Sequence, residues 1–286
     1  MAPSARAALR LALTWFLAVV AALAAVEGLA GWQREGGHAR LPIYAAAPPL
    51  SLRPGAAAVG LASGGTYRLA IDARGLRAPS PERGIVLLGD SMAFGLGVAG
   101  EATLAAQCTE RGHPMLNAGV PGFSLPDALA HAESFSAIAD GWMMLVNPWD
   151  DGQPALTAHA EPVGGWLLNR DAPAWAKRFF ASRWSHGQLL HEAVVLAGGL
   201  RPRAPVGSDF AARGREMAEF VRLHPKTRVV WAGYPGETMP DGRRADDERR
   251  AFGVETETLE LHDAWLPGDL HWTAEGTAQA AEQLCR

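Results

Sequence analysis

The chain has few cysteines and no excess of charge of one sign. Only Cys108 and Cys285 occur among 286 residues, and neither lies in a CxxC or Cys/His spacing that would indicate a zinc site. The two either form a disulfide, if the domain is exported, or are two buried thiols. The net charge is −4 and no long basic stripe is present, so we expect no nucleic-acid partner. We also expect no metal and no organic cofactor.

The N-terminus contains an uncharged run over residues 11–26, LALTWFLAVVAALAAV, which Arg6 and Arg10 precede. Basic residues before an apolar run favour an orientation with the N-terminus in the cytosol. We therefore expect residues 1–32 to be an N-terminal transmembrane helix that anchors the chain. A signal peptide cleaved after the small residues 22–24 is the alternative. In both cases the rest of the chain faces a non-cytosolic compartment.

Residues 33–60 are rich in Ala, Pro and Gly and predict a linker, which a small β-hairpin within residues 65–76 follows. We therefore treat residues 33–80 as a linker and hairpin region. From residue 81 to 286, short apolar runs alternate with helical stretches, which predicts an α/β domain with a parallel sheet covered on both faces. Residues 152–213 have mixed signals and predict an insertion over one end of the sheet.

The expected elements follow from these patterns. The expected strands are residues 84–90, 114–120, 142–146, 227–234 and, shorter, 254–261. The expected helices are residues 126–139, 173–197 with interruptions, 210–223 and 274–284.

Candidate catalytic residues follow the first three expected strands, at the edge where a parallel sheet binds ligands. Ser91 stands at a strand-to-helix turn, where its hydroxyl is exposed and its N–H points with the helix N-terminus, although a helix N-cap is the alternative. Gly122 lies in the glycine-rich segment after the second strand, which either presents N–H groups to a ligand or is a plain turn. Asn147, after the third strand, is either an oxyanion donor or part of an Asx turn.

A histidine and a carboxylate stand just ahead of the last expected helix. His271 can reach the same edge of the sheet, and Asp269 can accept the Nδ1 proton of its ring. That contact fixes the tautomer and stabilises the imidazolium. The other eight histidines lack such a context and are interpreted as surface or core residues.

The order of these segments resembles the four sequence blocks of the SGNH (GDSL-type) hydrolase family, over residues 81–286. IVLLGDSMAFGLGV is similar to the nucleophile block, LNAGVPGFSLPDAL to the glycine block, MMLVNPWDD to the third block and DLHWTAEGTAQAAEQL to the Asp/His block. The upstream RLAIDARGLRAPSPE and the N-terminal run resemble a bacterial membrane-anchored branch of the family. The resemblance implies a flavodoxin-like three-layer α/β/α sandwich with a parallel sheet.

The resemblance also implies roles for individual residues. Ser91 matches the nucleophile, His271 its base and Asp269 the acid that orients the base. The backbone N–H groups of Ser91 and Gly122 match the oxyanion donors.

The third block departs from the family pattern. It normally ends in Asn-Asp, the Asn side chain being the third oxyanion donor, and here that pair aligns with Asp150 and Asp151. A carboxylate at Asp150 repels an oxyanion unless it is protonated. Asn147 is the candidate replacement, and loss of one such donor costs roughly 10²–10³ in rate.

The fourth block departs in its spacing. The common arrangement is Asp-x-x-His, whereas this chain has Asp269-x-His271 with Gly268 at the usual position of the acid. Asp263 is a weaker candidate for the orienting acid.

These observations together predict a serine esterase that acts on an ester-bearing small molecule, lipid or glycan outside the cytosol, for example by deacetylating a glycan. The expected location is the bacterial inner membrane, with a single span and the catalytic domain in the periplasm or outside the cell. Two alternatives remain open: an O-acyltransferase that acetylates an exported polysaccharide, and an inactive envelope protein with the SGNH fold.

Overall fold

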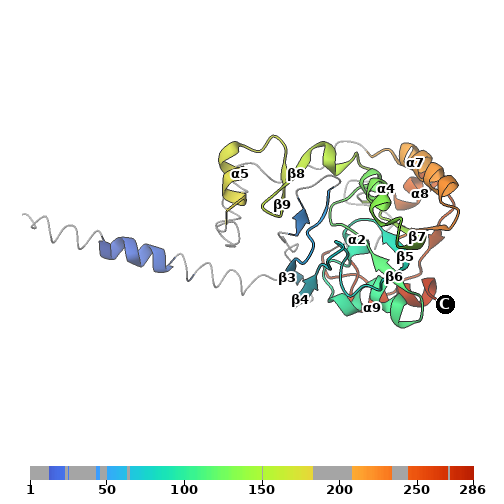
Figure 1. Ribbon diagram of the computed structural model, residues 1–286, viewed down its shortest axis with the longest axis horizontal. Helices are drawn as coiled ribbons and strands as arrows, with labels where there is room; N and C mark the ends of the chain where they lie inside the picture. The colour runs from blue at the N-terminus through green and yellow to red at the C-terminus, as the bar shows by residue number, and fades with distance from the viewer. Residues whose placement is uncertain are drawn as a thin grey trace, which may run out of the picture. The chain divides into compact units, whose positions relative to one another are not determined.

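A computed structural model describes residues 13–22, 25, 43–45, 50–62, 65–149, 151–182, 208–233, 244–269 and 271–286. The chain divides into two compact units. The main unit is Glu35–Asp171 with Pro202–Arg286, and the second unit is Met1–Arg34 with Ala172–Arg201. The main unit contains the large sheet (Figure 1) and the candidate catalytic residues Ser91, Asp269 and His271.

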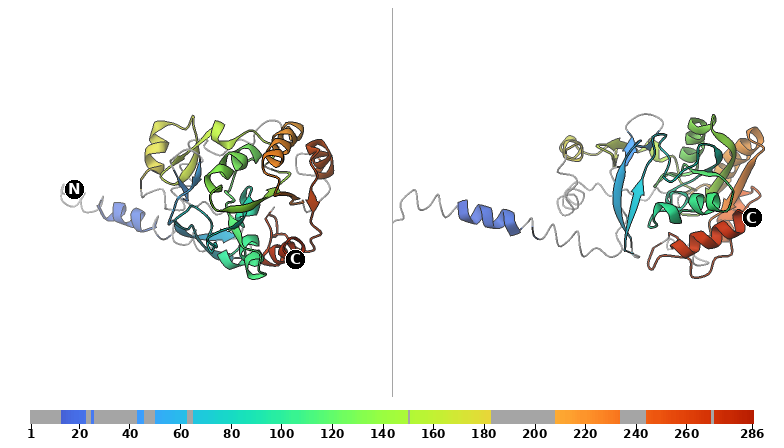
Figure 2. Two further views of the ribbon diagram at one scale, coloured as in Figure 1. Left: turned by 45° about the vertical axis from the view of Figure 1, so that its right-hand side comes forward. Right: turned by 60° about the horizontal axis from the view of Figure 1, so that its bottom comes forward.

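The main unit is built on a five-stranded, all-parallel sheet (Figures 1 and 2). Its strands are β5 (Gly84–Leu88), β6 (Met115–Asn117), β7 (Ala139–Val146), β10 (Thr227–Trp231) and β11 (Glu257–Thr258). They lie in the order β11-β10-β7-β5-β6. The chain runs from β5 to β6 on one side and returns to β7 on the other. The carboxyl end of β5 is therefore the switch point at which open α/β sheets bind ligands.

Helices cover both faces of this sheet, because its strands are apolar on both sides. Leu88 belongs to the core on one face, with residues of α4 (Leu125–Ala132), α7 (Phe210–Leu223) and α8 (Ala245–Phe252). Leu87 belongs to the core on the other face, with residues of α3 (Leu104–Glu110) and α9 (Ala274–Leu284). Successive residues of a strand face opposite sides, so each central strand needs a nearly continuous apolar sequence.

The α/β class expected from the alternating pattern is confirmed, and α7 and α9 have the bounds that the sequence predicted. Four of the five strands are shorter than expected, whereas β7 begins at Ala139, three residues before its expected start. β6 ends at Asn117, three residues before the expected limit, because the glycine-rich segment turns toward the end of β5: the N–H of Val120 donates to the carbonyl of Gly89 at 3.0 Å. α4 ends at Ala132 and passes into the 3-10 turn η2 (Glu133–Phe135).

Short elements complete the described parts of the chain. The two-stranded sheets pair β1 (Tyr44–Ala45) with β2 (Ser51–Leu52), β3 (Ala57–Ala62) with β4 (Gly65–Ala70), and β8 (Ala160–Val163) with β9 (Trp166–Asn169). The short helices are α2 (Ser91–Phe94) and the 3-10 turns η1 (Gly100–Ala102) and η3 (Leu156–Ala158) in the main unit, and α5 (Ala174–Phe180) in the second unit.

The hairpin near the start of the main unit differs from the prediction. We expected both of its strands within residues 65–76 and a linker up to residue 60, whereas β4 pairs antiparallel with β3 at 57–62. Small residues in β3 conceal the period of two that identifies a strand. Gly60 shows why one of them is small: a Cβ there would lie 2.2 Å from the ring of Tyr67 on the paired strand.

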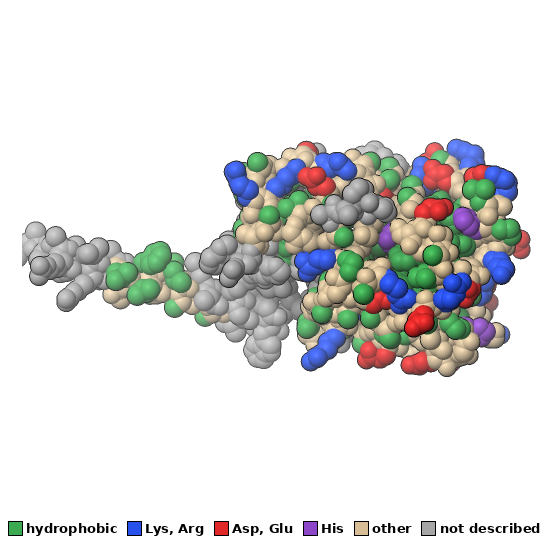
Figure 3. Space-filling model, viewed as in Figure 1, with side chains coloured by type: hydrophobic (Ala, Val, Ile, Leu, Met, Phe, Trp, Pro, Cys, Tyr) green, Lys and Arg blue, Asp and Glu red, His purple; other side chains and the backbone are tan. Residues whose placement is uncertain are grey.

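The described part of the second unit includes a helix over residues 13–22. The N-terminal helix presents a largely hydrophobic surface in Figure 3. Its exposed large apolar side chains are Leu13, Trp15, Phe16, Leu17, Val19 and Val20. Among the described residues, no helix combines the length and the apolar character that a membrane crossing requires. The expected anchor at residues 1–32 lies largely outside the described residues, as does the part of the expected insertion at 183–207.

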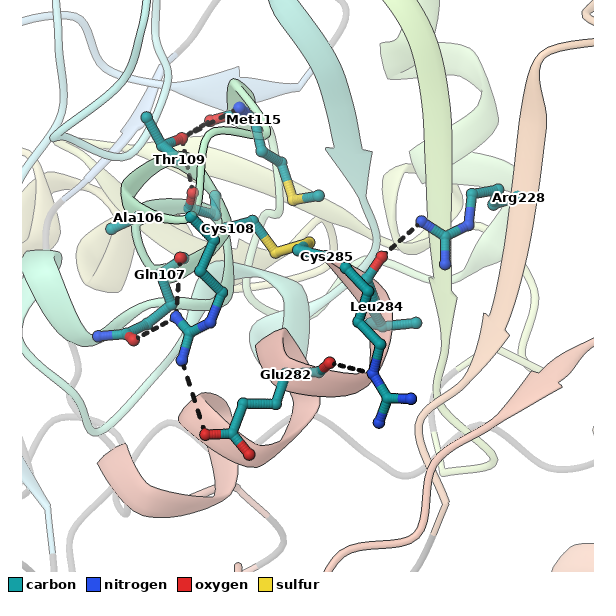
Figure 4. Close-up of a disulfide and its surroundings, with 12 residues drawn as sticks. Ala106, Gln107, Cys108, Thr109, Met115, Arg228, Glu282, Leu284 and Cys285 are labelled. Atoms are coloured by element: carbon teal, nitrogen blue, oxygen red, sulfur yellow. Dashed lines mark hydrogen bonds and ion pairs between the residues drawn. A yellow bond between two sulfur atoms is a disulfide. The ribbon is translucent and has the colours of Figure 1, made fainter.

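A disulfide joins the two helices on one face of the sheet. Cys108 of α3 and Cys285, which follows α9, are bonded, with their Cα atoms 5.4 Å apart (Figure 4). Arg228 of β10 donates to the carbonyl of Leu284 at 2.8 Å, so the end of α9 is also held to the sheet. Of the two alternatives that the sequence left open for the cysteines, the structure contains the disulfide.

We predict that this disulfide contributes strongly to stability, because it closes a loop across a sequence separation of 177 residues. Replacing both cysteines by alanine is expected to lower the free energy of unfolding by about 2–5 kcal/mol. Denaturant unfolding of the oxidised protein, the reduced protein and the double variant measures this. Equal midpoints for all three would contradict the prediction.

Candidate active site

Ser91 lies at the carboxyl end of β5, as the first residue of α2. The turn before it is tight, since a Cβ at Gly89 would lie 2.7 Å from the carbonyl oxygen of Leu145 on the neighbouring strand β7. The first N–H groups of a helix have no intrahelical acceptor. Within the described part of the chain, the Ser91 N–H forms no hydrogen bond with another group.

Asp90, directly before Ser91, is a fully buried carboxylate that holds this turn in place. One of its oxygens accepts a hydrogen bond from the N–H of Met92 at 2.8 Å and caps α2. The other accepts from the side-chain amide of Asn147, after β7, at 2.6 Å. Because a buried carboxylate is stable only when hydrogen-bonded, these contacts tie the Ser91 turn to the end of the next strand.

Asn147 is held on three sides. Its N–H donates to Asp151 at 2.5 Å, and its side-chain oxygen accepts from the N–H of Trp149 at 3.0 Å. The last contact is the Asx turn that the sequence left open as an alternative. The amide nitrogen uses one hydrogen on Asp90, and an amide carries two.

The glycine-rich segment after β6, residues 119–124, lies against α2. A Cβ at Gly119 would come 2.3 Å from the backbone nitrogen of Phe94, so only glycine allows this close approach. Gly122 has a φ of +83°, a conformation that other residues rarely adopt. Its N–H, like that of Ser91, forms no hydrogen bond with any described residue.

His271 and Asp269 lie in a loop that folds back on itself before α9. The N–H of Leu266 donates to the carbonyl of His271 at 2.8 Å, and the N–H of Thr273 donates to the carbonyl of Ala264 at 2.7 Å. Thr273 also caps α9. The loop is thereby fixed to the helix that the disulfide holds in place.

Three side chains from this loop and the β5 turn form one line. The Nε2 atom of His271 is 2.8 Å from the Oγ atom of Ser91, and its Nδ1 atom is 2.5 Å from an oxygen of Asp269. That same oxygen accepts from the His271 N–H at 3.2 Å. With the ring proton on Nδ1, the ring donates to Asp269 and accepts from the Ser91 hydroxyl. Ser91 is 8 % exposed and His271 is 7 % exposed, so the line is nearly enclosed by protein.

The other predicted site residues have different surroundings. Asp150 lies outside the described residues. Asp263 is exposed and, within the described parts, has no hydrogen bond to His271. Among the described residues, no group of His, Cys, Asp or Glu side chains is placed to hold a metal ion.

Arg77 packs against α2, and the sequence patterns indicated no role for it. Its guanidinium lies 4.4 Å from the centre of the Phe94 ring, and it donates to the carbonyl of Val98. Its backbone N–H donates to Asn117 of β6 at 3.0 Å. Burial lowers the pKa of Arg77 to about 10. An arginine that closely precedes an apolar strand was the available signal, but its burial depends on the tertiary fold.

His131 lies on α4 among aromatic rings. Its ring centre is 5.6 Å from that of Phe123 and 4.9 Å from that of Phe135. Neither ring nitrogen has a hydrogen-bond partner among the described residues, and burial lowers its pKa from 6.5 to about 4. The ring is therefore a neutral core residue at ordinary pH.

Comparison with known proteins adds no assignment: neither the scan against family profiles nor the search of curated proteins found a match.

The contact between Asn147 and Asp90 generates a prediction. Asn147→Asp is nearly isosteric but places a second carboxylate against a buried one, so it is expected to lower the free energy of unfolding by about 1–3 kcal/mol. The same exchange at Asn169, a half-buried residue of β9, is the control and is expected to cost much less. Denaturant unfolding measures both variants, and equal losses would contradict the role given to this contact.

The buried His131 generates a second prediction. Because the pKa is about 4 in the folded state and 6.5 when unfolded, the unfolded chain binds more protons between these values. Stability is therefore lost as the pH falls from 6.5 to 4, by about 3 kcal/mol for this group. His131→Phe is expected to remove that part of the pH dependence, as measured by unfolding between pH 4 and 7. An unchanged profile would contradict the prediction.

Proposed function

We propose that this protein is a serine esterase of the SGNH type, in which Ser91 attacks an ester carbonyl, His271 is the base and Asp269 orients it. The observation that carries the proposal is the line of contacts from Asp269 through His271 to the Ser91 hydroxyl, at 2.5 and 2.8 Å. These separations lie within hydrogen-bond reach, as proton transfer between a nucleophile and its base requires.

In the proposed mechanism, His271 takes the Ser91 proton through Nε2 as Oγ forms a bond to the carbonyl carbon. The imidazolium is stabilised by Asp269, whose carboxylate accepts from Nδ1. His271 then gives its proton to the leaving alcohol, and an acyl-enzyme remains on Ser91. In the second half-reaction His271 takes a proton from water, whose oxygen attacks the acyl carbon. The bond from that carbon to Oγ then breaks, His271 returns the proton to Ser91 Oγ, and the acid is released.

The N–H groups of Ser91 and Gly122 are the proposed oxyanion donors. Both come from loops after adjacent strands, and the bond from Val120 to Gly89 holds these loops together at 3.0 Å. Donors that need no reorganisation stabilise a developing negative charge most effectively. The second hydrogen of the Asn147 amide is the proposed third donor, because the first is used on Asp90.

We also propose a flavodoxin-like fold and an extracytoplasmic, membrane-anchored location for this protein. When the five strands are numbered along the chain and read from β6 to β11, their order in the sheet is 2-1-3-4-5. This order supports a flavodoxin-like three-layer fold. The disulfide supports an oxidising, extracytoplasmic compartment. The exposed apolar side chains of residues 13–22 support a membrane anchor within residues 1–32. Envelope esters, such as acylated glycans or lipids, are the proposed substrates.

We predict that a fluorophosphonate probe labels the purified protein at Ser91. Ser91→Ala is expected to abolish labelling, and Ser134→Ala, an exposed serine, is the control. Asp269→Asn is expected to reduce the labelling rate by about 10³-fold or more, whereas Asp263→Asn is expected to leave it unchanged. Mass spectrometry and labelling rates measure these outcomes. Failure of the folded wild-type protein to label would favour an inactive protein with this fold.

Hydrolysis and acyl transfer share the first half-reaction, so the acceptor separates them. We predict that acetate is released from an acetylated glycan at a rate that an added glycan acceptor does not change. Acetyl transfer to the acceptor, at the expense of free acetate and dependent on Ser91, would assign the protein as an O-acyltransferase instead.

A further inference from the structure

The segment at residues 151–169, here called the arm, leaves the end of β7 and contains η3, β8 and β9. It begins beside the candidate site, because Asp151 accepts a hydrogen bond from the N–H of Asn147. The N–H of Asp151 donates in return to the carbonyl of Asn147 at 3.1 Å. The start of the arm is therefore fixed at the carboxyl end of β7.

The arm is also fixed to the loop after β6. Asp127, a buried residue of α4, accepts hydrogen bonds from the N–H of Leu156 at 2.6 Å and from the hydroxyl of Thr157 at 2.9 Å. The same carboxylate accepts from the hydroxyl of Ser124 at 2.8 Å, at the end of the glycine-rich segment. One buried carboxylate thus joins the arm to the segment that contains the proposed oxyanion donor.

A second contact joins the same two parts of the chain. The hydroxyl of Tyr44 donates to the carbonyl of Pro121 at 2.9 Å, and the N–H of Tyr44 donates to Gly165, in the turn between β8 and β9, at 3.0 Å. Burial raises the pKa of Tyr44, so the hydroxyl remains protonated and able to donate.

These anchors determine where the arm runs. β5 lies between β7 and β6 in the sheet, so a segment fixed to the end of β7 and to the loop after β6 passes near the end of β5, where Ser91 stands. The side chain of Leu156 approaches the proposed oxyanion donor Gly122: a Cβ at Gly122 would lie 3.5 Å from the Cδ2 atom of Leu156. The Leu156 side chain is only partly buried.

The position of Leu156 relative to His271 indicates which part of an ester it meets. His271 protonates the leaving alcohol, so the alcohol lies on the side of the His271 loop. Trp272, next to His271, belongs to the core on the α3 and α9 face. Leu156 packs against the core on the α4 and α7 face. The acyl group, opposite the alcohol, therefore meets Leu156.

We propose that Leu156 is a specificity-determining residue, which forms an apolar wall against the acyl group and restricts the enzyme to short acyl chains such as acetyl. This inference rests on the proposed function. The hydrogen bonds that Asp127 accepts from Leu156 and Thr157 hold this part of the arm in place, so a longer acyl chain cannot displace it without breaking these partly buried contacts.

The test is the ratio of kcat/KM for p-nitrophenyl octanoate to that for the acetate, in the wild-type protein and in variants. The wild-type protein is expected to prefer the acetate. Leu156→Ala is expected to raise the ratio by about 10-fold or more, and Leu156→Phe to lower it. Leu156→Met, of similar volume, and Leu223→Ala, at an exposed leucine at the end of α7, are the controls and are expected to keep the wild-type ratio.

The outcomes distinguish this inference from the function on which it rests. A raised ratio in Leu156→Ala, with Ser91-dependent turnover, supports the wall. An unchanged ratio in both Leu156→Ala and Leu156→Phe, with turnover retained, overturns the wall and leaves the esterase intact. If the folded wild-type protein has no Ser91-dependent turnover on any ester of the series, the proposed esterase is overturned and the inference with it.

Discussion

The geometry of the candidate site depends on the hydrogen bonds that the buried carboxylate of Asp90 accepts. It caps the short helix that begins with Ser91 and accepts the Asn147 amide from the end of β7. A charge in the interior requires hydrogen bonds to remain stable, so any movement of the Ser91 turn away from β7 leaves that charge without one of its donors. The position of the serine is thus maintained by electrostatics as well as by packing.

The other parts of the site are attached to the same framework by different means. Gly119 allows the loop after β6 to lie against the backbone of α2, and the guanidinium of Arg77 packs on the ring of Phe94. The loop with His271 is continuous with α9, which the disulfide from Cys285 holds to α3. Each candidate residue therefore lies at the start of a helix or in a loop that rigid elements hold in place, as a preorganised site requires.

The arm at residues 151–169 is connected to the candidate site through the loop after β6. Asp127 and Tyr44 connect it to the loop that contains Gly122, so its position is coupled to that of the proposed oxyanion donor. A substitution in the arm can for this reason shift the loop that contains Gly122 without contacting Ser91. The hydrogen-bonded line of Ser91, His271 and Asp269 and the arm beside it are in this way carried by separate segments of the chain.

The sequence by itself determined the class of the fold and the order of its elements. Short apolar runs between amphipathic stretches required a parallel sheet with both faces covered, and the bounds of α7 and α9 followed from their periodicity. Ser91, His271 and Asp269 were predicted as site residues from their positions near the ends of elements together with the order of their segments, which resembles that of a known family. Strand β3 was missed, since alanine and glycine give no alternating signal.

Only the tertiary structure decided which groups meet. The pairing of Cys108 with Cys285, the burial of Arg77 and the role of Asp127 all involve residues far apart along the chain. Local periodicity reports which face of an element is apolar, whereas a hydrogen bond across 57 residues, such as that from Asn147 to Asp90, depends on the register of neighbouring strands. That register is set by the packing of the whole core, and no short segment of sequence contains it.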